Sequence, residues 1–374
     1  MRIAILQSTS PASISMSVYA QNIAESLRNV QPSWNIVEFS PKISAASKGS
    51  QLSHTVNKYY QRYWNYPRSF KVQEADIFHI VDHSDGHLVP WLKSFGKKTV
   101  VTCHDLINLV QPDLYQGLAI MPLISLNTWR WSVQKMKEAD HIITVSAYTA
   151  GDVISELGVD PAMLTAIPNA VSSEFQPVTD EETVSFRQRH GVAPETFCIL
   201  NVGSNNPRKN ISRILDVMKQ LQDQQQAVHF WKAGSDFNAE QYAFIAEHDL
   251  ARQISYLGRP SALMLKTLYS AADALIAPSI YEGFGLTVLE SMACGTPVIT
   301  ANTTSLPEVA GNAAVLVDPQ DTEGMTKAVI RLQQDPTFRQ QLIRAGLDRV
   351  KTFTWDRTAH QIANVYEHVA SKKS

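Results

Sequence analysis

The feature that most constrains the fold of this chain is a regular alternation of short apolar runs with longer amphipathic stretches. Short runs rich in β-branched residues predict buried strands, and the longer stretches predict helices. Strands that alternate with helices are typical of a parallel sheet covered by helices on both faces. The first series predicts strands at 3–6, 77–81, 99–102, 141–145 and 164–167, with helices at 18–29 and 147–157.

A second series of the same kind begins near residue 197, and a chain of 374 residues is too long for one ordinary core. We therefore expect an α/β protein with two doubly wound, Rossmann-like domains, at 1–175 and 186–352. The polar stretch from Ser172 to Glu182 is the expected linker and hinge. Residues 353–374 are expected to add a helix that ends near Val369. The second series predicts strands at 197–202, 228–233, 254–257, 274–277, 298–300 and 314–317, with helices at 211–222, 241–249, 263–272 and 286–294.

Composition excludes several classes of protein. A formal net charge of −2 and 18% charged residues give no sign of nucleic-acid binding. No apolar run approaches the length of a membrane-spanning helix or a signal peptide, so we expect a cytoplasmic protein. The cysteines Cys103, Cys198 and Cys294 lie in apolar runs without metal-ligand spacing, which favours free buried thiols.

Two glutamates, Glu282 and Glu290, lie eight positions apart around a Gly-Phe-Gly turn. The helix expected from Leu286 to Cys294 begins just after this turn and ends at Gly295. Glycine lets the backbone amides at a helix start approach an anion, here a diphosphate. The two carboxylates are then placed to reach different hydroxyls of one ligand, so the segment suits a sugar nucleotide.

A second anion-binding loop follows the strand expected at 197–202. Arg208 and Lys209 supply positive charge there, which suits a departing diphosphate. The alternative is a solvated helix start, but cations are poorly placed beside the positive end of a helix dipole. The sequence contains no Asp-x-Asp pair, so we expect no metal and no cofactor.

Taken in order, these segments resemble retaining glycosyltransferases of family 4, which have the two-domain GT-B fold. The resemblance implies two domains that face a cleft, with Glu282 on donor-sugar hydroxyls and Glu290 on the ribose. It also implies that the N-terminal domain binds the acceptor, that the C-terminal domain binds the nucleotide sugar, and that the helix at 353–374 crosses back to the N-terminal domain. Many family members carry an arginine where this chain has Ser204, so that role would pass to Arg208. The resemblance rests on the Glu-x7-Glu signature at 282–290, the loop Leu200–Asn210, the segment Ser305–Gly311, the pair His104-Asp105 and the run Ile167–Val171.

The strand expected at 99–102 ends at His104 and Asp105. A lone histidine at a strand end is more often structural than catalytic. The family resemblance implies instead that His104 binds a donor-sugar hydroxyl or lies beside the acceptor. Retention implies a same-face displacement in which the departing phosphate oxygen takes the acceptor proton. The expected catalytic residues are His104, Arg208, Lys209 and Glu282, and the expected donor-binding residues are Gly203, Ser204, Arg208, Lys209, Arg259, Glu282, Gly283, Phe284, Gly285, Leu286, Thr287 and Glu290.

For the acceptor we expect Ser13, in a serine-rich first loop, together with His83 and Asp105. The polar loop 82–87 has no spacing typical of metal ligands, so an acceptor loop or an ordinary turn is preferred. Residues 39–73 hold six Lys/Arg, no Asp or Glu and many aromatic residues. This patch fits either peripheral contact with a membrane surface or a packed helix whose cations reach solvent.

The sequence therefore predicts a metal-independent hexosyltransferase that acts on a glycan or lipid-linked acceptor. A mannosyl donor is slightly preferred over a glucosyl one, because the segments His104-Asp105 and Ser305–Gly311 resemble those of mannosyltransferase-like family members. The expected substrate is a GDP-sugar or a UDP-sugar. The alternatives are a non-catalytic glycan-binding module, or a sugar-nucleotide epimerase or phosphorylase on the same fold.

Overall fold

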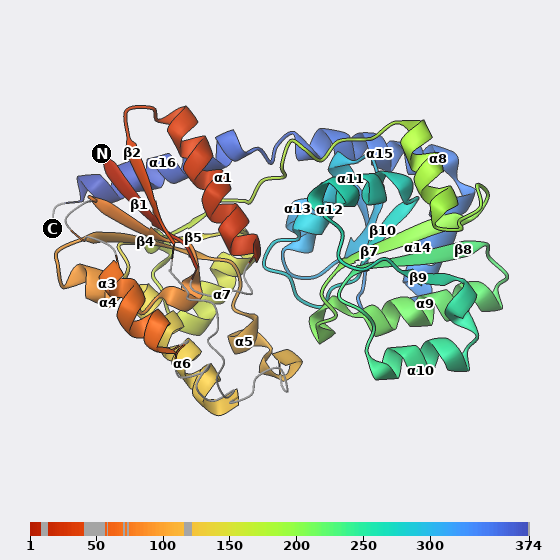
Figure 1. Cartoon of the computed structure of the whole chain (residues 1–374), viewed down its shortest axis with the longest axis horizontal. Helices are drawn as coiled ribbons and strands as arrows, with labels where there is room; N and C mark the ends of the chain where they lie inside the picture. Colours follow the sequence, from red (N-terminus) through yellow and green to blue (C-terminus); the bar gives the residue numbers. More distant parts are fainter. Residues whose placement is uncertain are drawn as a thin grey trace. The chain divides into compact units, whose positions relative to one another are not determined.

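The computed structural model describes residues 1–8, 14–40, 57, 59–69, 72, 75–115 and 122–372. The chain forms two compact units (Figure 1). The first comprises Met1–Pro112, Gln116–Asn169 and Trp355–Ser374, and the second comprises Asp113–Tyr115 and Ala170–Thr354. Among the described residues, no helix is both long and apolar enough to cross a membrane.

The first unit is built on a six-stranded parallel sheet with the order β2-β1-β3-β4-β5-β6. The strands expected from the sequence are confirmed. One strand was not predicted. Strand β2 lies at the edge of the sheet and pairs with β1, and the partly exposed residues of β2 lack a clear apolar run. The strands are β1 (Arg2–Leu6), β2 (Asn35–Phe39), β3 (Ile77–Ile80), β4 (Lys98–Cys103), β5 (His141–Thr144) and β6 (Leu164–Ala166).

Alternate residues of these strands fill two apolar layers, one on each face of the sheet. On β1, Ile3 and Ile5 pack with α1 and α16, whereas Ala4 and Leu6 face the opposite layer. This period of two is what a sheet buried on both faces requires. The helical segments of the unit are α1 (Ile14–Val30), η1 (Gln61–Asn65), α3 (Tyr66–Ser69), η3 (His83–Asp85), α4 (Leu88–Lys93), α5 (Ile107–Val110), α6 (Pro122–Lys135), η5 (Met136–Glu138), α7 (Ala147–Leu157), η6 (Pro161–Met163) and α16 (Trp355–Ser371).

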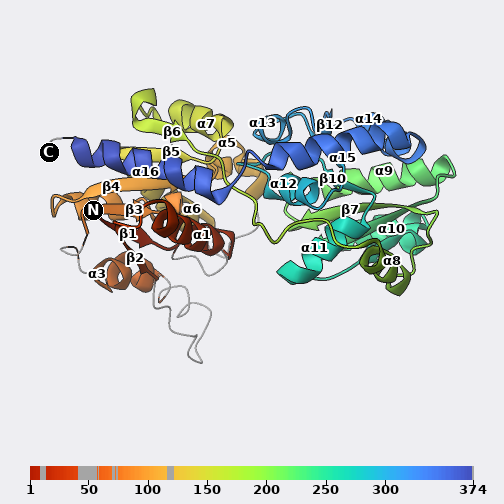
Figure 2. The ribbon, with the colours of Figure 1, turned by 90° about the horizontal axis from the view of Figure 1, so that it is seen from above.

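The last helix, α16, belongs to the first unit although it follows the second in sequence. It packs along α1, and Figure 2 shows the two helices side by side. The hydroxyl of Tyr366 lies 2.6 Å from Nδ1 of His79, and Nζ of Lys98 donates to the carbonyl of Val369 at 2.8 Å. Apart from Asp113–Tyr115, which group with the second unit, the polypeptide passes between the units near residue 170 and near residue 354.

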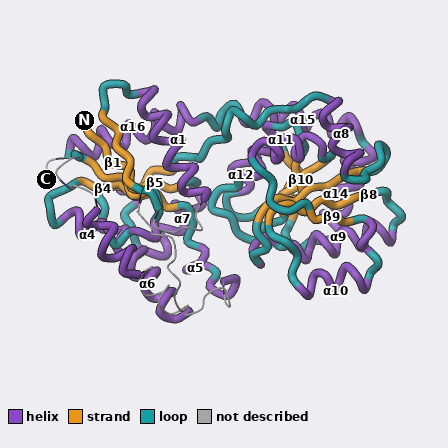
Figure 3. The backbone as a smooth tube through the Cα atoms, in the orientation of Figure 1, coloured by secondary structure: helices purple, strands orange, loops and turns teal. Residues whose placement is uncertain are grey.

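The second unit has a six-stranded parallel sheet with the order β12-β11-β10-β7-β8-β9. Figure 3 shows these strands as one layer among the helices. The strands are β7 (Phe197–Gly203), β8 (Val228–Gly234), β9 (Ile254–Tyr256), β10 (Ala274–Ala277), β11 (Val298–Ala301) and β12 (Ala314–Val317). The helical segments are α8 (Asp180–Arg189), η7 (Pro207–Lys209), α9 (Ile211–Asp223), α10 (Ala239–Glu247), η8 (Leu250–Arg252), α11 (Ala262–Ala271), α12 (Leu286–Ala293), α13 (Leu306–Ala310), α14 (Thr322–Gln334) and α15 (Pro336–Val350). Most of the short segment η4 (Pro112–Tyr115) also groups with this unit.

Both sheets are doubly wound, which confirms the expected fold class. In the second sheet the direction of winding reverses between β7 and β10, and in the first it reverses between β1 and β3. Ligands of such sheets bind beyond the strand ends at this switch point.

The linker predicted at Ser172–Glu182 is too long at its C-terminal end. Helix α8 begins at Asp180, because Thr179 and Glu182 form a capping box. Three acidic residues in the first turn also favour the helix, so its polar composition was misread as linker.

Candidate functional site

The predicted donor residues of the second unit lie on two loops at its topological switch point. One loop follows β7 and contains η7, and the other follows β10 and leads into α12. The loops are tied together, since the amide of Ile280 donates to the carbonyl of Arg208 at 2.8 Å. Asn210, in the left-handed conformation, adds a side-chain bond to the carbonyl of Pro278 at 3.1 Å.

Glu282 is the centre of this site and is only 8% exposed. Its Oε1 accepts from Nζ of Lys209 at 2.5 Å and from the hydroxyl of Ser279 at 2.8 Å. Its Oε2 accepts from the Arg208 guanidinium at 2.6 Å. The structure thus brings together three of the four residues expected to be catalytic, and both oxygens of the carboxylate face cations.

Electrostatics keep Glu282 ionised. Burial alone would raise the pKa of this carboxyl, but the charges and hydrogen bonds of Lys209 and Arg208 outweigh it and lower the pKa to about 2. A group with this pKa holds no proton near neutrality, so it acts through its charge rather than as a general acid or base. One carboxylate faces two cations, which leaves the cluster with surplus positive charge.

Glu290 lies in a contrasting environment on α12. The hydroxyl of Tyr269 donates to its Oε2 at 2.7 Å. Burial raises the pKa of Glu290, against the lowering effects of this hydrogen bond and of the Lys209 charge. The two glutamates of the motif therefore have pKa values shifted in opposite directions.

The start of α12 is open to an anion. Its N-cap, Gly285, has φ 110° and supplies no side-chain cap. A Cβ at Gly285 would lie 2.8 Å from Cδ2 of Leu306, so the turn has no room for a side chain. Ser305 holds the turn by donating to the carbonyls of Glu282 and Phe284, at 2.9 and 2.8 Å. Uncapped amides in the first turn of a helix are a favourable place for a phosphate.

The remaining expected donor residues lie around these two loops. Gly203 ends β7, and Ser204 continues from it toward η7. The side chain of Arg259 is exposed beyond β9 and makes no hydrogen bond or ion pair with described residues. Gly283, Phe284, Leu286 and Thr287 form the turn and the first residues of α12.

In the first unit, His104 is buried at the end of β4. Its Nε2 donates to the carbonyl of Val81 at 2.8 Å, and the ring of Tyr19 packs edge-on at 4.9 Å between centroids. Burial is the main reason why the pKa of His104 is lowered to about 4. The imidazole is therefore neutral near pH 7, with Nδ1 as its remaining hydrogen-bond acceptor.

The expected acceptor residues have different surroundings. His83 is buried beside Asp82, and its Nδ1 lies 3.4 Å from the amide of His104. Asp105 accepts from the amide of Ile107 at 3.3 Å, near the start of α5. Ser13 lies outside the described residues. No group of three or more potential metal ligands occurs within the described ranges.

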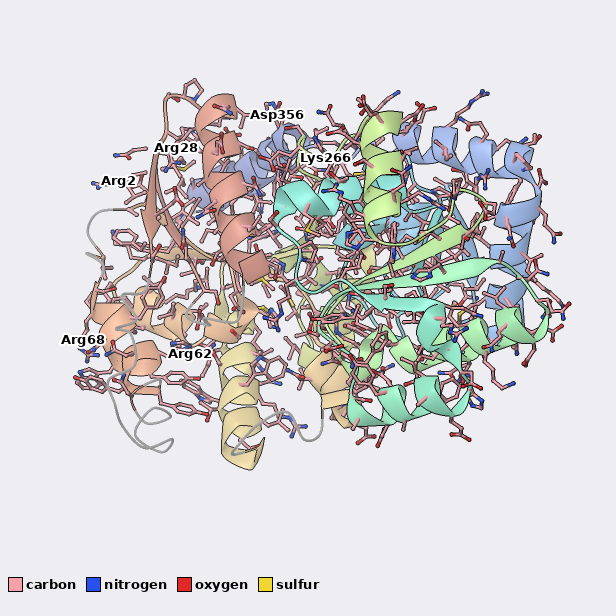
Figure 4. All side chains as sticks on the ribbon, turned by 45° about the vertical axis from the view of Figure 1, so that its right-hand side comes forward. Arg2, Arg28, Arg62, Arg68, Lys266 and Asp356 are labelled. Carbon is pink, nitrogen blue, oxygen red and sulfur yellow. The ribbon has the colours of Figure 1, made fainter. Side chains whose placement is uncertain are left out.

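The described part of the patch at 39–73 is divided between buried and exposed side chains. Tyr66 is buried and donates to the carbonyl of Gln7 at 2.8 Å. Arg62, labelled in Figure 4, forms an ion pair with Asp85 at 2.9 Å. Trp64 is 53% exposed, with the guanidinium of Arg68 3.6 Å from its ring centroid. Much of the patch lies outside the described residues.

Several side-chain contacts at these sites were not predicted from the sequence. Ser8, after β1, donates to Asp82, after β3, at 2.5 Å, which joins the two loops at the first switch point. Tyr269 binds Glu290 from another helix, and Lys232 is buried in β8. Only Lys232 had a usable signal in the sequence, because a lysine inside an apolar strand breaks the local pattern.

Known proteins match the chain along most of its length. The family model of glycosyl transferases group 1 matches residues 183–349, and that of glycosyltransferase family 4 matches residues 37–175. O-antigen chain mannosyltransferase B of Escherichia coli is 30% identical over 276 residues, covering 72% of this chain and 70% of that protein. Serotype-specific mannosyltransferase WbdA of Escherichia coli is 29% identical over 304 residues, covering 76% of this chain but 36% of WbdA.

The same fold is found in a solved structure of sucrose-phosphate synthase from Thermosynechococcus elongatus. The match has a TM-score of 0.77 and 21% sequence identity, and covers 99% of both chains. These matches agree with the two doubly wound sheets and with the order of the sequence motifs. The chain belongs to the glycosyl transferases group 1, within glycosyltransferase family 4, and has the GT-B fold.

Proposed function

We propose that this chain transfers a mannosyl group from a nucleoside diphosphate sugar to a glycan or lipid-linked glycan, with retention of anomeric configuration. The observation that carries the proposal is the cluster of Glu282, Lys209 and Arg208 beside the uncapped start of α12. This cluster has surplus positive charge and lies at the switch point of the second sheet. Such a place suits a diphosphate leaving group.

The chemistry follows from charge. Cleavage of the bond between the anomeric carbon and the phosphate oxygen leaves negative charge on the diphosphate, which Lys209 and the α12 amides stabilise. The anomeric carbon gains positive character, which the ionised Glu282 stabilises electrostatically. The acceptor oxygen forms its bond on the same face, and its proton passes to the departing phosphate oxygen. The chain then supplies positioning and fixed charge, without a metal or a cofactor.

Mannose is proposed as the donor sugar because the similar O-antigen chain enzyme and WbdA are both named mannosyltransferases. Glucose is the second candidate. GDP and UDP are the candidate nucleotides, with the ribose on Glu290. The unprotonated Nδ1 of His104 can accept a hydrogen bond from a hydroxyl of the sugar. A lipid-linked acceptor would bring the chain to the cytoplasmic face of a membrane, where exposed Trp64 and Arg68 suit the interface.

The direct test is turnover with a panel of GDP- and UDP-hexoses and mannosyl acceptors, with the anomeric configuration of the product read by NMR. Retained configuration, with equal rates in EDTA and in added Mg²⁺, is expected. Inverted product, or activity only with added metal, would contradict the mechanism. Sugar-nucleotide binding without turnover would favour the non-catalytic glycan-binding alternative. Activity with inorganic phosphate as acceptor would favour a phosphorylase, and conversion of the donor sugar to its epimer would favour an epimerase.

A further inference from the structure

Lys232 is a fully buried lysine near the C-terminal end of β8, outside the motifs that define the donor site. Its side chain is 0% exposed. Its Nζ donates to the carbonyl of Gly203 and to that of Ala233, both at 2.8 Å. Within the described part of the chain it forms no ion pair. The ammonium is thus surrounded by neutral partners in the protein interior.

The backbone above this ammonium is unusually close-packed. Gly203 of β7 pairs with Gly234 of β8, and a Cβ at Gly234 would lie 2.2 Å from the Gly203 carbonyl oxygen. That oxygen also accepts from the amide of Ser235 at 3.0 Å. Because residue 234 is a glycine, Lys232 and Ser235 can both donate hydrogen bonds to the carbonyl of Gly203. This carbonyl lies where the loop that contains η7 begins, at the end of β7.

A second ammonium, that of Lys209, lies close to the same residue. Cε and Nζ of Lys209 would be 3.6 and 3.8 Å from a Cβ at Gly203. Lys209 is neutralised by Glu282, whereas Lys232 has no such carboxylate. Two ammonium groups therefore lie near Gly203, one from η7 that is paired with Glu282 and one from β8 that forms no ion pair with described residues.

The neighbouring charges do not compensate Lys232. Burial first, and then the charge of Lys209, lower its pKa to about 8, while Asp236 raises it. Asp236 is exposed and accepts from the hydroxyl of Tyr242 at 2.7 Å. On the adjacent position of β7, Oδ1 of Asn201 is buried without a hydrogen bond. A buried ammonium without a counter-charge destabilises the folded chain, so its presence here favours a bound anion that supplies the counter-charge.

The charge balance of the site indicates which anion. Arg208 and Lys209 face Glu282, which leaves a surplus of one positive charge, and Lys232 adds another. The diphosphate of a nucleotide sugar carries one negative charge on each phosphate. Lys232 therefore adds one positive charge to the cations that would face this diphosphate.

We propose that Lys232 is a positioning residue of the donor site, which fixes the carbonyl of Gly203 and supplies positive charge beneath the loop that binds the diphosphate. This role rests on the proposed function and extends it to a residue outside the family motifs. Lys232 would add its charge to that of Arg208, which is expected to replace the arginine that many family members carry where this chain has Ser204.

The test compares Lys232→Met with Lys219→Met, an exposed control on α9 whose partner is Asp223. Melting temperatures without ligand and calorimetric Kd values for GDP, UDP and ADP are measured, with the matching nucleosides titrated by ligand-observed NMR. We expect Lys232→Met to melt at or above the wild-type temperature, since a buried unpaired charge has been removed. Its affinity for the preferred diphosphate should fall by about tenfold to a hundredfold, with nucleoside affinity unchanged. Lys219→Met should match the wild type.

The pH dependence gives a second readout that a purely structural role would not change. In the wild type, diphosphate affinity should fall between pH 7 and pH 9 as Lys232 loses its proton, and binding in this range should take up protons. Lys232→Met should show neither effect. Unchanged diphosphate affinity in the variant, or equal losses for diphosphate and nucleoside with a lower melting temperature, would overturn the proposal. If no nucleotide binds the wild type, the proposed function fails instead.

Discussion

Replacing Glu282 by glutamine tests whether its carboxylate is held by charge. A fall in pKa from 4.5 to about 2 corresponds to about 3 kcal/mol of stabilisation in the folded state, at about 1.4 kcal/mol per unit. Glutamine keeps the shape but leaves Lys209 and Arg208 without a counter-charge. We therefore expect Glu282→Gln to lower the free energy of unfolding of the second unit by about 3 kcal/mol near pH 7.

The sign of the pH dependence follows from the direction of the shift. The folded chain binds a proton on Glu282 less readily than the unfolded chain, so the stabilisation is complete above about pH 5. It is lost as pH falls from about 4.5 toward about 2. The difference in stability between the wild type and Glu282→Gln should shrink over this range.

The assay is urea-dependent hydrogen exchange of peptides from the second unit, which reports the stability of that unit by itself. Glu290→Gln is the matched control, because burial raises the pKa of Glu290. A raised carboxyl pKa disfavours the folded state as the group ionises, so this variant should gain stability relative to the wild type as pH rises. The reasoning is refuted if Glu282→Gln is as stable as the wild type, or if the difference is the same at pH 7 and at pH 3.

Three further predictions concern single side chains. Lys209→Met should lower kcat by about a hundredfold to a thousandfold while acceptor KM stays nearly constant, because it removes the positive charge that stabilises the diphosphate leaving group. Steady-state kinetics check this prediction, with Lys219→Met as the control. Gly285→Ala should destabilise the second unit by more than about 1 kcal/mol, since a Cβ there meets Leu306 and φ is 110°; wild-type stability in hydrogen exchange would count against it. His104 should give no ionisation between pH 6 and pH 8 in an NMR titration, because its pKa is lowered to about 4; a shift centred near pH 6.5 would contradict the buried neutral imidazole.

The sequence predicted most of the helices and strands because they depend on local pattern. The strand at Ala274–Ala277 and the helix at Ala147–Leu157 match the predicted bounds. The turn before α12 was predictable because Gly285, with φ 110°, has a backbone conformation that other residues rarely adopt. Strand β2 was missed because an edge strand needs no apolar run.

Side-chain partners were not predictable, since they depend on which strands become neighbours. Lys209 and Glu282 are 73 positions apart and meet because β7 and β10 are adjacent in the sheet. In the same way, the bond from His104 to Val81 needs β3 beside β4. The return of α16 to the first unit was expected from the family resemblance, whereas periodicity alone predicts a helix and its apolar face but not the surface that this face covers.

The central claim is that a diphosphate binds between Lys209 and the first amides of α12. A crystal structure of the chain with bound nucleoside diphosphate tests it most directly. We predict that the terminal phosphate lies within hydrogen-bond distance of Nζ of Lys209 and of the amides at 286–287. A nucleotide whose phosphates lie away from both groups would contradict the account.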